Sequence, residues 1–400
     1  MLNKKTLCIT TCLMLFSIML TSCTLPYTKP KFLSSNQTSI QSQGLDQLLK
    51  EDNEVDVVFV HGMCRHDTDW VQNNIKNISE IYKLVTPKDV DIGKPSTFGK
   101  TKLYESSLYL SNGKKIMIYS ILWSDETLQA KKTLCYDRQF DTPQDLEKSD
   151  GKYCKGLVKD EKLTRAYANN ILKSTLLNEC LSDALAYAGA ASSPIQKDMS
   201  DAIASISSEN KFPIVVITES LGSKIFYDTL LAMLTKSLRQ VNNNKLFDSA
   251  VNVRQRIQEV YLEANQIPIL SLADPDPSSA TSTINVATDS MTMFFSLPKP
   301  SSLLIELDKY KIIPVIAFSD PNDIFSYPLN GSSQAEQNQI NGNLNLNFID
   351  VITSNTNTWF GLLENPLSAH LEYENNQTVL QVIKCGLGIK QKEVVITCDK

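Results

Sequence analysis

Histidine is scarce in this chain, with only His61, His66 and His370 among 400 residues. This scarcity nearly excludes a zinc site built from several histidines, and it leaves three candidates for a catalytic imidazole. The cysteines form no closely spaced C-x-x-C pair, which argues against a metal or redox centre of that kind. Excess basic charge is also missing, because the formal net charge is -5. We therefore expect no metal site and no nucleic-acid partner.

Internal repeats and strongly biased composition are absent as well. Hydrophobic residues make up 42% of the chain and charged residues 21%. These values are ordinary for globular proteins, so disordered, collagen-like and coiled-coil classes are excluded. The length allows one large domain or two smaller ones. The oligomeric state is left open.

A hydrophobic run long enough to cross a bilayer is missing at the N-terminus. Leu7–Leu20 follows the positive flank of Lys4 and Lys5, but it is shorter than the roughly 20 residues that a spanning helix needs. The pattern is typical of a targeting segment. The run ends in Leu20-Thr21-Ser22-Cys23, which resembles the lipobox of bacterial lipoproteins.

This resemblance implies a signal peptide over residues 1–22, cleavage before Cys23 and acylation of its new N-terminus. The lipid membrane would then be a partner, and the protein would lie in a bacterial cell envelope. Thr24 is non-acidic, similar to lipoproteins sorted to the outer membrane. The alternative is a plain secretory signal or a short anchor. Residues 23–53 are polar and predict a tether to the folded part.

Six cysteines remain after the signal peptide and Cys23 are set aside. An even number fits disulfides in an exported protein, because that compartment is oxidising. The local pairs Cys135 with Cys154 and Cys385 with Cys398 are favoured. Cys64 with Cys180 is then left by elimination.

Short continuous apolar runs, each closed by turn residues, indicate strands buried on both faces. They are Val55–Val60, Ile116–Trp123, Phe212–Thr218, Val260–Leu272, Ile312–Phe318 and Phe348–Thr353. Helical periodicity separates several of them, over Trp70–Leu84, Lys162–Ala188 and Leu221–Leu238. We therefore expect an α/β domain over residues 54–400 with a doubly wound, mostly parallel sheet. A polar stretch at about 125–162 predicts a cap-like insertion whose charges are solvated.

The strongest motif places a serine between a strand and a helix. Thr218-Glu219-Ser220-Leu221-Gly222 follows the apolar run of residues 212–218. It resembles the G-x-S-x-G nucleophile elbow of α/β-hydrolases, with Thr218 in place of the first glycine. The alternative makes Ser220 only the N-cap of a helix. Glu219 either shapes the pocket or contacts polar groups of the substrate, or it is an exposed carboxylate at the helix start.

A second segment matches the same family. His61-Gly62 closes the apolar run of residues 55–60 and resembles the H-G loop that supplies an oxyanion-hole amide. The resemblance implies that the backbone amides of Met63 and Leu221 form the oxyanion hole. We expect His61 to be structural and His66 to lie at the surface or the rim of the site.

The family's chain order is serine, acid, histidine, and only His370 follows Ser220. The resemblance therefore implies His370 as the base. Asp320 and Asp323 both follow the run of residues 312–318. Asp323 is the preferred acid because the family acid lies several residues beyond the strand. Asp320 is the alternative, and it could instead cap a turn before Pro321.

The resemblance to α/β-hydrolase serine esterases and lipases implies hydrolysis of carboxylic esters through an acyl-enzyme, with no cofactor. Lipids or acylated envelope molecules are the expected substrates. Met291–Leu297 is either an acyl groove or part of the core. Two alternatives stay open: an amidase or thioesterase with the same triad, and a non-catalytic lipoprotein that binds envelope components.

Overall fold

The computed structural model describes residues 23–26, 30–34, 42–84, 92–138, 152–158, 165–207, 211–239, 244–270, 272, 289–296, 312–329, 346–359, 363–390 and 393–398. The expected signal peptide, residues 1–22, lies outside this part. Within the described residues, none of the helices combines the length and the apolar character needed to cross a bilayer.

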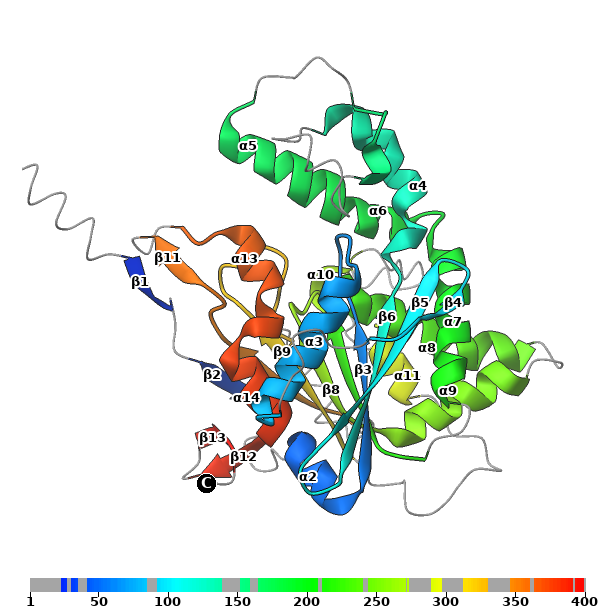
Figure 1. Ribbon diagram of the computed structural model, residues 1–400, viewed down its shortest axis with the longest axis vertical. Helices are drawn as coiled ribbons and strands as arrows, with labels where there is room; N and C mark the ends of the chain where they lie inside the picture. The colour runs from blue at the N-terminus through cyan, green and yellow to red at the C-terminus, as the bar shows by residue number, and fades with distance from the viewer. Residues whose placement is uncertain are drawn as a thin grey trace, which may run out of the picture.

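The centre of the molecule is a nine-stranded sheet in the order β2-β10-β9-β8-β7-β3-β6-β5-β4 (Figure 1). The six strands from β10 to β6 are parallel, and β2, β5 and β4 are antiparallel additions at the edges. The strands are β2 (Lys31–Ser34), β3 (Glu54–Val60), β4 (Ser96–Phe98), β5 (Thr101–Tyr109), β6 (Lys115–Leu122), β7 (Ile214–Glu219), β8 (Ile257–Glu263), β9 (Ile313–Ser319) and β10 (Leu346–Ile352). The expected α/β class with a mostly parallel sheet is confirmed.

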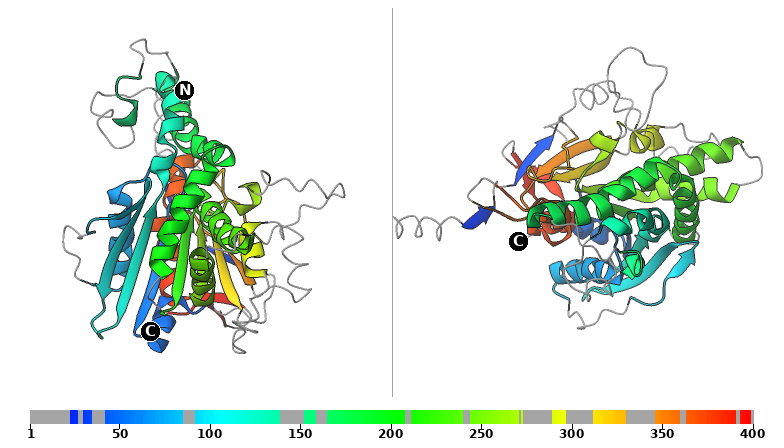
Figure 2. Two further views of the ribbon diagram at one scale, coloured as in Figure 1. Left: turned by 90° about the vertical axis from the view of Figure 1, so that its right-hand side faces the viewer. Right: turned by 90° about the horizontal axis from the view of Figure 1, so that it is seen from above.

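Helices cover both faces of the sheet (Figure 2), an arrangement compatible with a doubly wound fold. One face packs against α7 (Ser192–Ser207), α8 (Leu221–Arg239), α9 (Asn244–Arg256) and α11 (Ser290–Ser296). The other packs against α2 (Gly44–Glu51), α3 (Thr68–Ile81) and α14 (Gln377–Cys385). Successive strand residues alternate between these two cores: Val58 and Val60 belong to the first, Val57 and Phe59 to the second.

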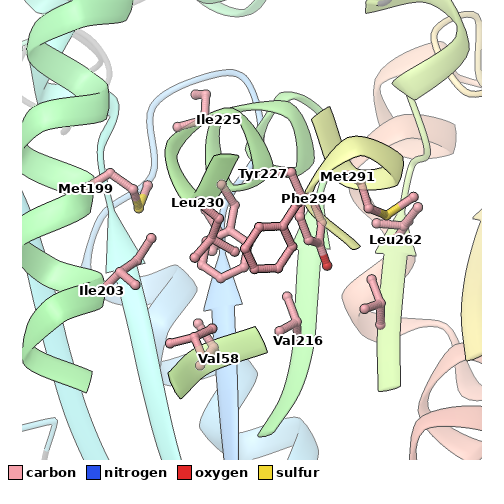
Figure 3. Close-up of a cluster of buried hydrophobic side chains, with 14 of the residues drawn as sticks. Val58, Met199, Ile203, Val216, Ile225, Tyr227, Leu230, Leu262, Met291 and Phe294 are labelled. Carbon is pink, nitrogen blue, oxygen red and sulfur yellow. The ribbon is translucent and has the colours of Figure 1, made fainter. Parts of the chain in front are cut away.

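The first core includes Met291, Phe294 and Phe295, from the segment that the sequence assigns either to an acyl groove or to the core. Met291, Phe294 and Phe295 are at most 5% exposed, and Phe294 packs near Tyr227 and Leu230 (Figure 3). These three side chains belong to the core, whereas Met293 is 39% exposed. Leu297 lies outside the described residues.

The run Val260–Leu272 does not form one strand. β8 ends at Glu263, and a short helix, α10 (Ile267–Leu270), follows. A short apolar run cannot be assigned to strand or helix by its periodicity alone.

The stretch expected to be a polar tether contains regular structure. β2 pairs with β10 at the edge of the sheet, and β1 (Cys23–Pro26) pairs with β11 (Asn357–Trp359). Helix α2 buries Leu45, Leu48 and Leu49. The buried carboxylate of Glu259 accepts hydrogen bonds from the amides of Gln43 and Gly44 at the start of this helix. Packing on the sheet therefore begins before residue 54.

An arm projects beyond the carboxyl end of β6, at the top of Figure 1. Its elements are η1 (Ser124–Glu126), α4 (Leu128–Lys131), η2 (Lys132–Asp137), η4 (Lys152–Cys154), α5 (Tyr167–Ile171), the π-helix η5 (Leu172–Leu181) and α6 (Ser182–Ala188). The projecting part thus extends past residue 162.

The expectation that the charges of this region are solvated is wrong for its centre. Lys131 is 1% exposed, and its Nζ lies 3.1 Å from Glu179 Oε1 and 2.9 Å from Asp183 Oδ2. Arg138 and the Tyr153 hydroxyl each contact Glu179 Oε2 at 2.5 Å. A buried ionic network therefore fixes α4, η2 and η4 against η5 and α6.

The three expected disulfides are present. Cys135 is joined to Cys154 within the arm, and Cys385 to Cys398 at the C-terminal hairpin of β12 (Leu387–Lys390) and β13 (Glu393–Ile396). Cys64 is joined to Cys180, which links the loop after β3 to η5.

Candidate active site

Ser220 lies between β7 and α8 in a backbone conformation that is rare for non-glycine residues. Its φ is 51°, in the left-handed region that normally costs an L-residue free energy. The amide of Ser220 donates to the carbonyl of Glu263 on β8 at 2.8 Å. The serine therefore occupies a sharp strand-to-helix turn that neighbouring strands hold in place.

Two glycines allow the backbone to approach this turn closely. A Cβ on Gly222 would lie 2.3 Å from the carbonyl oxygen of His61, and one on Gly62 would lie 2.7 Å from the Cβ of Ser220. Neither substitution could occur without a backbone shift. Thr218, where the family motif has its first glycine, is fully buried in β7, so the turn accommodates a side chain at that position.

Ser220, His370 and Asp323 form one chain of polar contacts. Nε2 of His370 lies 3.2 Å from Ser220 Oγ, and Nδ1 lies 2.9 Å from each carboxylate oxygen of Asp323. His370 is in α13 (Pro366–Leu371), which follows β10 and β11, and Asp323 follows β9. All three side chains are at most 5% exposed. The structure thus brings together the three residues proposed for the triad.

Tyr373 is a further partner of the acid that sequence reasoning missed. Its hydroxyl donates to Asp323 Oδ2 at 3.2 Å, and the amide of Phe325 donates to Oδ1 at 2.9 Å. Tyr373 belongs to a short 3-10 helix, η10 (Tyr373–Asn375). Its position three residues after His370 was the only signal in the sequence, and this spacing is not specific.

Asp320 lies apart from the base and is used in a turn. Its Oδ1 accepts from the amide of Asn322 at 2.8 Å, and its Oδ2 accepts from the amide of Asn355 at 2.7 Å. Burial raises the pKa of Asp320 to about 6. Of the two candidate acids, Asp323 is therefore the one in contact with His370.

His61 fixes the loop after β3 and has the structural position expected for it. Its Nε2 accepts from the amides of Trp123 and Ser124 at 2.9 and 3.2 Å, so Nδ1 carries the proton and donates to the carbonyl of Gly62 at 2.8 Å. Burial, followed by the nearby His66, lowers the pKa of His61 well below 6.5. This neutral imidazole joins β3 to the end of β6.

The two proposed oxyanion-hole residues flank the nucleophile. Met63 is buried in the loop after Gly62, and Leu221 begins α8 directly after Ser220. Neither backbone amide donates a hydrogen bond to another residue in the part of the chain that the structure describes. Nε2 of His66 donates to the carbonyl of Met63 at 3.0 Å. Burial lowers the pKa of His66 to about 4, so it is neutral at pH 7.

Glu219 is buried rather than exposed, and two other glutamates lie near it. Burial, then the charges of Glu374 and Glu263, raise the pKa of Glu219 well above 4.5, while hydrogen bonds from the Gly62 amide and Trp70 oppose that shift. Burial raises the pKa of Glu263 to about 8 and that of Glu374 to about 7. The Glu219 carboxyl thus accepts from the Gly62 amide and from Trp70, and links the end of β7 to the loop after β3 and to α3.

A cavity of about 620 Å³ adjoins these residues. Its walls come from residues 65–73, from Glu219 and from residues 371–375, which are close in sequence to Met63, Ser220 and His370 respectively. Trp70 and Leu371 are its apolar lining side chains, and the others are acids, amides, Arg65 and His66. Within the described residues, no group of three or more His, Cys, Asp or Glu side chains is arranged to hold a metal ion.

Comparison with protein-family models, with curated proteins and with solved structures finds no match. Any functional assignment therefore depends on the geometry of the site and on the motifs that carry the resemblance.

Proposed function

We propose that the protein is a serine hydrolase of the α/β-hydrolase type that cleaves carboxylic esters. The observation that carries this proposal is the chain of contacts from Ser220 through His370 to Asp323. The position of the site supports it, because parallel α/β sheets bind ligands beyond the carboxyl ends of their strands. The left-handed backbone of Ser220 and the close approach of Gly62 and Gly222 are also what a nucleophile elbow requires.

In the proposed reaction, His370 Nε2 takes the proton of Ser220 as Oγ attacks the ester carbonyl carbon. The amides of Met63 and Leu221 stabilise the resulting oxyanion. Collapse of the tetrahedral intermediate breaks the bond to the alkoxy oxygen, which takes the proton from His370 and leaves as the alcohol. Water, deprotonated by His370, then attacks the acyl-enzyme and releases the acid. Asp323 keeps the imidazole in the tautomer with a proton on Nδ1, and Tyr373 holds the carboxylate.

The polar cavity supports a substrate with a polar group beside the ester bond. Burying one methylene of a substrate in the cavity favours binding by only about 0.8 kcal/mol. A lining carboxylate or amide that loses its water to an apolar group, without gaining a hydrogen bond, costs more free energy than that. Acylated envelope molecules with hydroxyl-rich or charged head groups fit this cavity better than a bare acyl chain does. Lipids remain candidates through their head groups.

For location, we propose a lipid-anchored protein of a bacterial envelope, with the outer membrane as the favoured site. The support is the Leu20-Thr21-Ser22-Cys23 sequence. In a bacterial host, palmitate should label the wild type, and Cys23→Ser should abolish labelling and release the protein from membranes. Unchanged labelling in that variant would exclude acylation at this cysteine.

The catalytic proposal is tested with a fluorophosphonate probe on protein beginning at residue 24. We expect wild type to be labelled, Ser220→Ala to be unlabelled, and His370→Ala to react slowly. Asp323→Asn should lower kcat on 4-nitrophenyl acetate by about 10⁴-fold. Asp320→Asn is its matched control and should keep most activity. A folded wild type that neither reacts nor hydrolyses esters would exclude this function.

The role of the cavity is tested with glycerol monobutyrate and ethyl butyrate, which share an acyl group. Asn73→Leu changes a lining side chain and should lower kcat/KM for the glycerol ester only. Asn112→Leu, in an exposed turn, is the control. An equal change in kcat/KM for both esters would show that the cavity does not recognise the polar part of the substrate.

A further inference from the structure

The Cys64–Cys180 disulfide connects the proposed oxyanion loop to the arm. Cys64 directly follows Met63, and Cys180 lies in η5, 116 residues further along the chain. Both cysteines are buried, at 8% and 1% exposure. The bond therefore joins the loop beside the nucleophile to an element that projects from the sheet.

The loop needs external support at this point. Cys64 has a φ of 72°, a left-handed conformation that a non-glycine residue keeps only when its surroundings impose it. Before Met63, the backbone is held by groups of the central sheet, through His61 and Glu219. After Met63, a hydrogen bond from His66 holds the Met63 carbonyl, and the disulfide adds a covalent restraint from the arm.

The arm end of this restraint is itself fixed. Cys180 follows Glu179 and precedes Asp183, the two carboxylates that contact the buried ammonium of Lys131. Asp183 also accepts from the hydroxyl of Thr127 at 2.5 Å. The network therefore holds Cys180 relative to the end of β6, which also contacts His61.

We propose that the Cys64–Cys180 disulfide is a positioning element for the oxyanion donor of Met63, so that the arm contributes to stabilisation of the transition state. This inference rests on the proposed ester hydrolysis. An oxyanion donor acts only when its N–H lies at hydrogen-bond distance from the developing charge, and losing one such donor lowers kcat by about 10²–10³-fold. A freed loop should therefore slow the chemical step and leave ground-state binding nearly unchanged.

The test uses the other two disulfides as matched controls. We compare Cys64→Ser/Cys180→Ser with Cys135→Ser/Cys154→Ser, inside the arm, and with Cys385→Ser/Cys398→Ser, in the C-terminal hairpin. Kinetics on 4-nitrophenyl acetate should show kcat lowered by about 10²-fold in the first variant only. Its KM and the pH profile of kcat/KM should match wild type, because the triad is untouched.

A trifluoromethyl ketone that forms a tetrahedral adduct with Ser220 gives a second readout. Its affinity should fall in the first variant by the same factor as kcat/KM. Wild-type kcat in that variant would overturn the inference. So would a shifted pH profile, or an equal loss of kcat in all three variants.

Graded reduction of the wild type covers the case in which the variant does not fold. Dithiothreitol reduces each disulfide to two thiols and is itself oxidised to its cyclic disulfide, and mass spectrometry of alkylated peptides measures each pair. Loss of kcat should follow reduction of Cys64–Cys180 and reverse on reoxidation. Loss that follows another pair, or no loss, contradicts the inference. If intact wild type does not react with the fluorophosphonate, the proposed function fails instead.

Discussion

The sheet and the arm differ in what fills most of their interiors. The strands of the sheet pack two apolar cores against helices on both faces, whereas the centre of the arm is a buried network of charges around Lys131. Apolar burial is non-directional. A buried ion pair offsets the desolvation of its charges only when the geometry is good. We therefore expect the arm to be the more sensitive of the two to the loss of a single polar group.

The largest effect is expected from a cavity in the sheet core. Phe294→Ala removes a side chain with 0% exposure and should lower the free energy of unfolding by about 3–5 kcal/mol. Urea denaturation followed by circular dichroism measures it. Met293→Ala, at an adjacent position that is 39% exposed, should change stability little. Similar losses in both would mean that the α11 core is not packed as described.

Lys131→Met tests the arm. It leaves Glu179 and Asp183 buried without their shared cation, and we expect a loss of about 3 kcal/mol. Because the network is confined to the arm, limited proteolysis should cut there first while the sheet stays protected. The neighbouring Lys132 is exposed, so Lys132→Met should keep the wild-type cleavage pattern. If Lys131→Met is cleaved in the arm at the wild-type rate, the buried charges do not stabilise the arm.

A buried carboxyl at the sheet end should make stability depend on pH. The pKa of Glu263 is raised by burial, then by the charge of Glu374, from 4.5 to about 8. The folded state therefore binds the proton more tightly than the unfolded state, and its contribution to stability, full below pH 4.5, is lost as the pH rises towards 8.

The fall of Tm between pH 5 and pH 8 should thus be smaller in Glu263→Gln than in wild type. The difference should correspond to on the order of 3 kcal/mol. Glu105→Gln, at an exposed position of β5, should leave the slope as it is. A steeper fall of Tm with pH in Glu263→Gln would mean that folding lowers the pKa of Glu263 rather than raising it.

The smallest effect is expected for a solvated ion pair. Lys76 and Glu80 lie 3.6 Å apart on α3, with side chains 58% and 55% exposed. Lys76→Ala should cost about 0.3–0.5 kcal/mol, and salt should reduce the difference. Chemical denaturation at low and high ionic strength measures both. If Lys76→Ala destabilises the protein nearly as much as Lys131→Met, burial does not explain the difference in strength between exposed and buried ion pairs.

The sequence predicts the parallel strands well. They are buried on both faces of the sheet, and such strands are continuous apolar runs in the sequence. Five of the six expected runs coincide closely with β3, β6, β7, β9 and β10. The hairpin of β4 and β5 was not predicted because residues 105–109 of β5 alternate exposed and half-buried positions near the edge of the sheet, and so form no continuous apolar run. Its register depends on pairing with β6, which no local pattern encodes.

The buried network of the arm could not be predicted, because lysine, glutamate and aspartate side chains normally stay exposed to water. Lys131 loses its water only because Glu179 and Asp183, about fifty residues away, are brought beside it. At the site, the order of motifs indicated Ser220 and His370 without a structure. The sequence favoured Asp323 over Asp320 but could not show that the amides of Asn322 and Asn355 donate to the carboxylate oxygens of Asp320.

The pairing of β1 with β11 places Cys23 opposite Trp359, on the segment that leads into α13 and His370. If Cys23 carries acyl chains and His370 is the base, as proposed, the acylated residue would be paired with the strand that precedes the helix of the base. A hydrolase anchored in this way would search a surface rather than a volume. Its encounters with esters in the same leaflet would be limited by lateral diffusion, and a soluble ester would gain no advantage from the anchor.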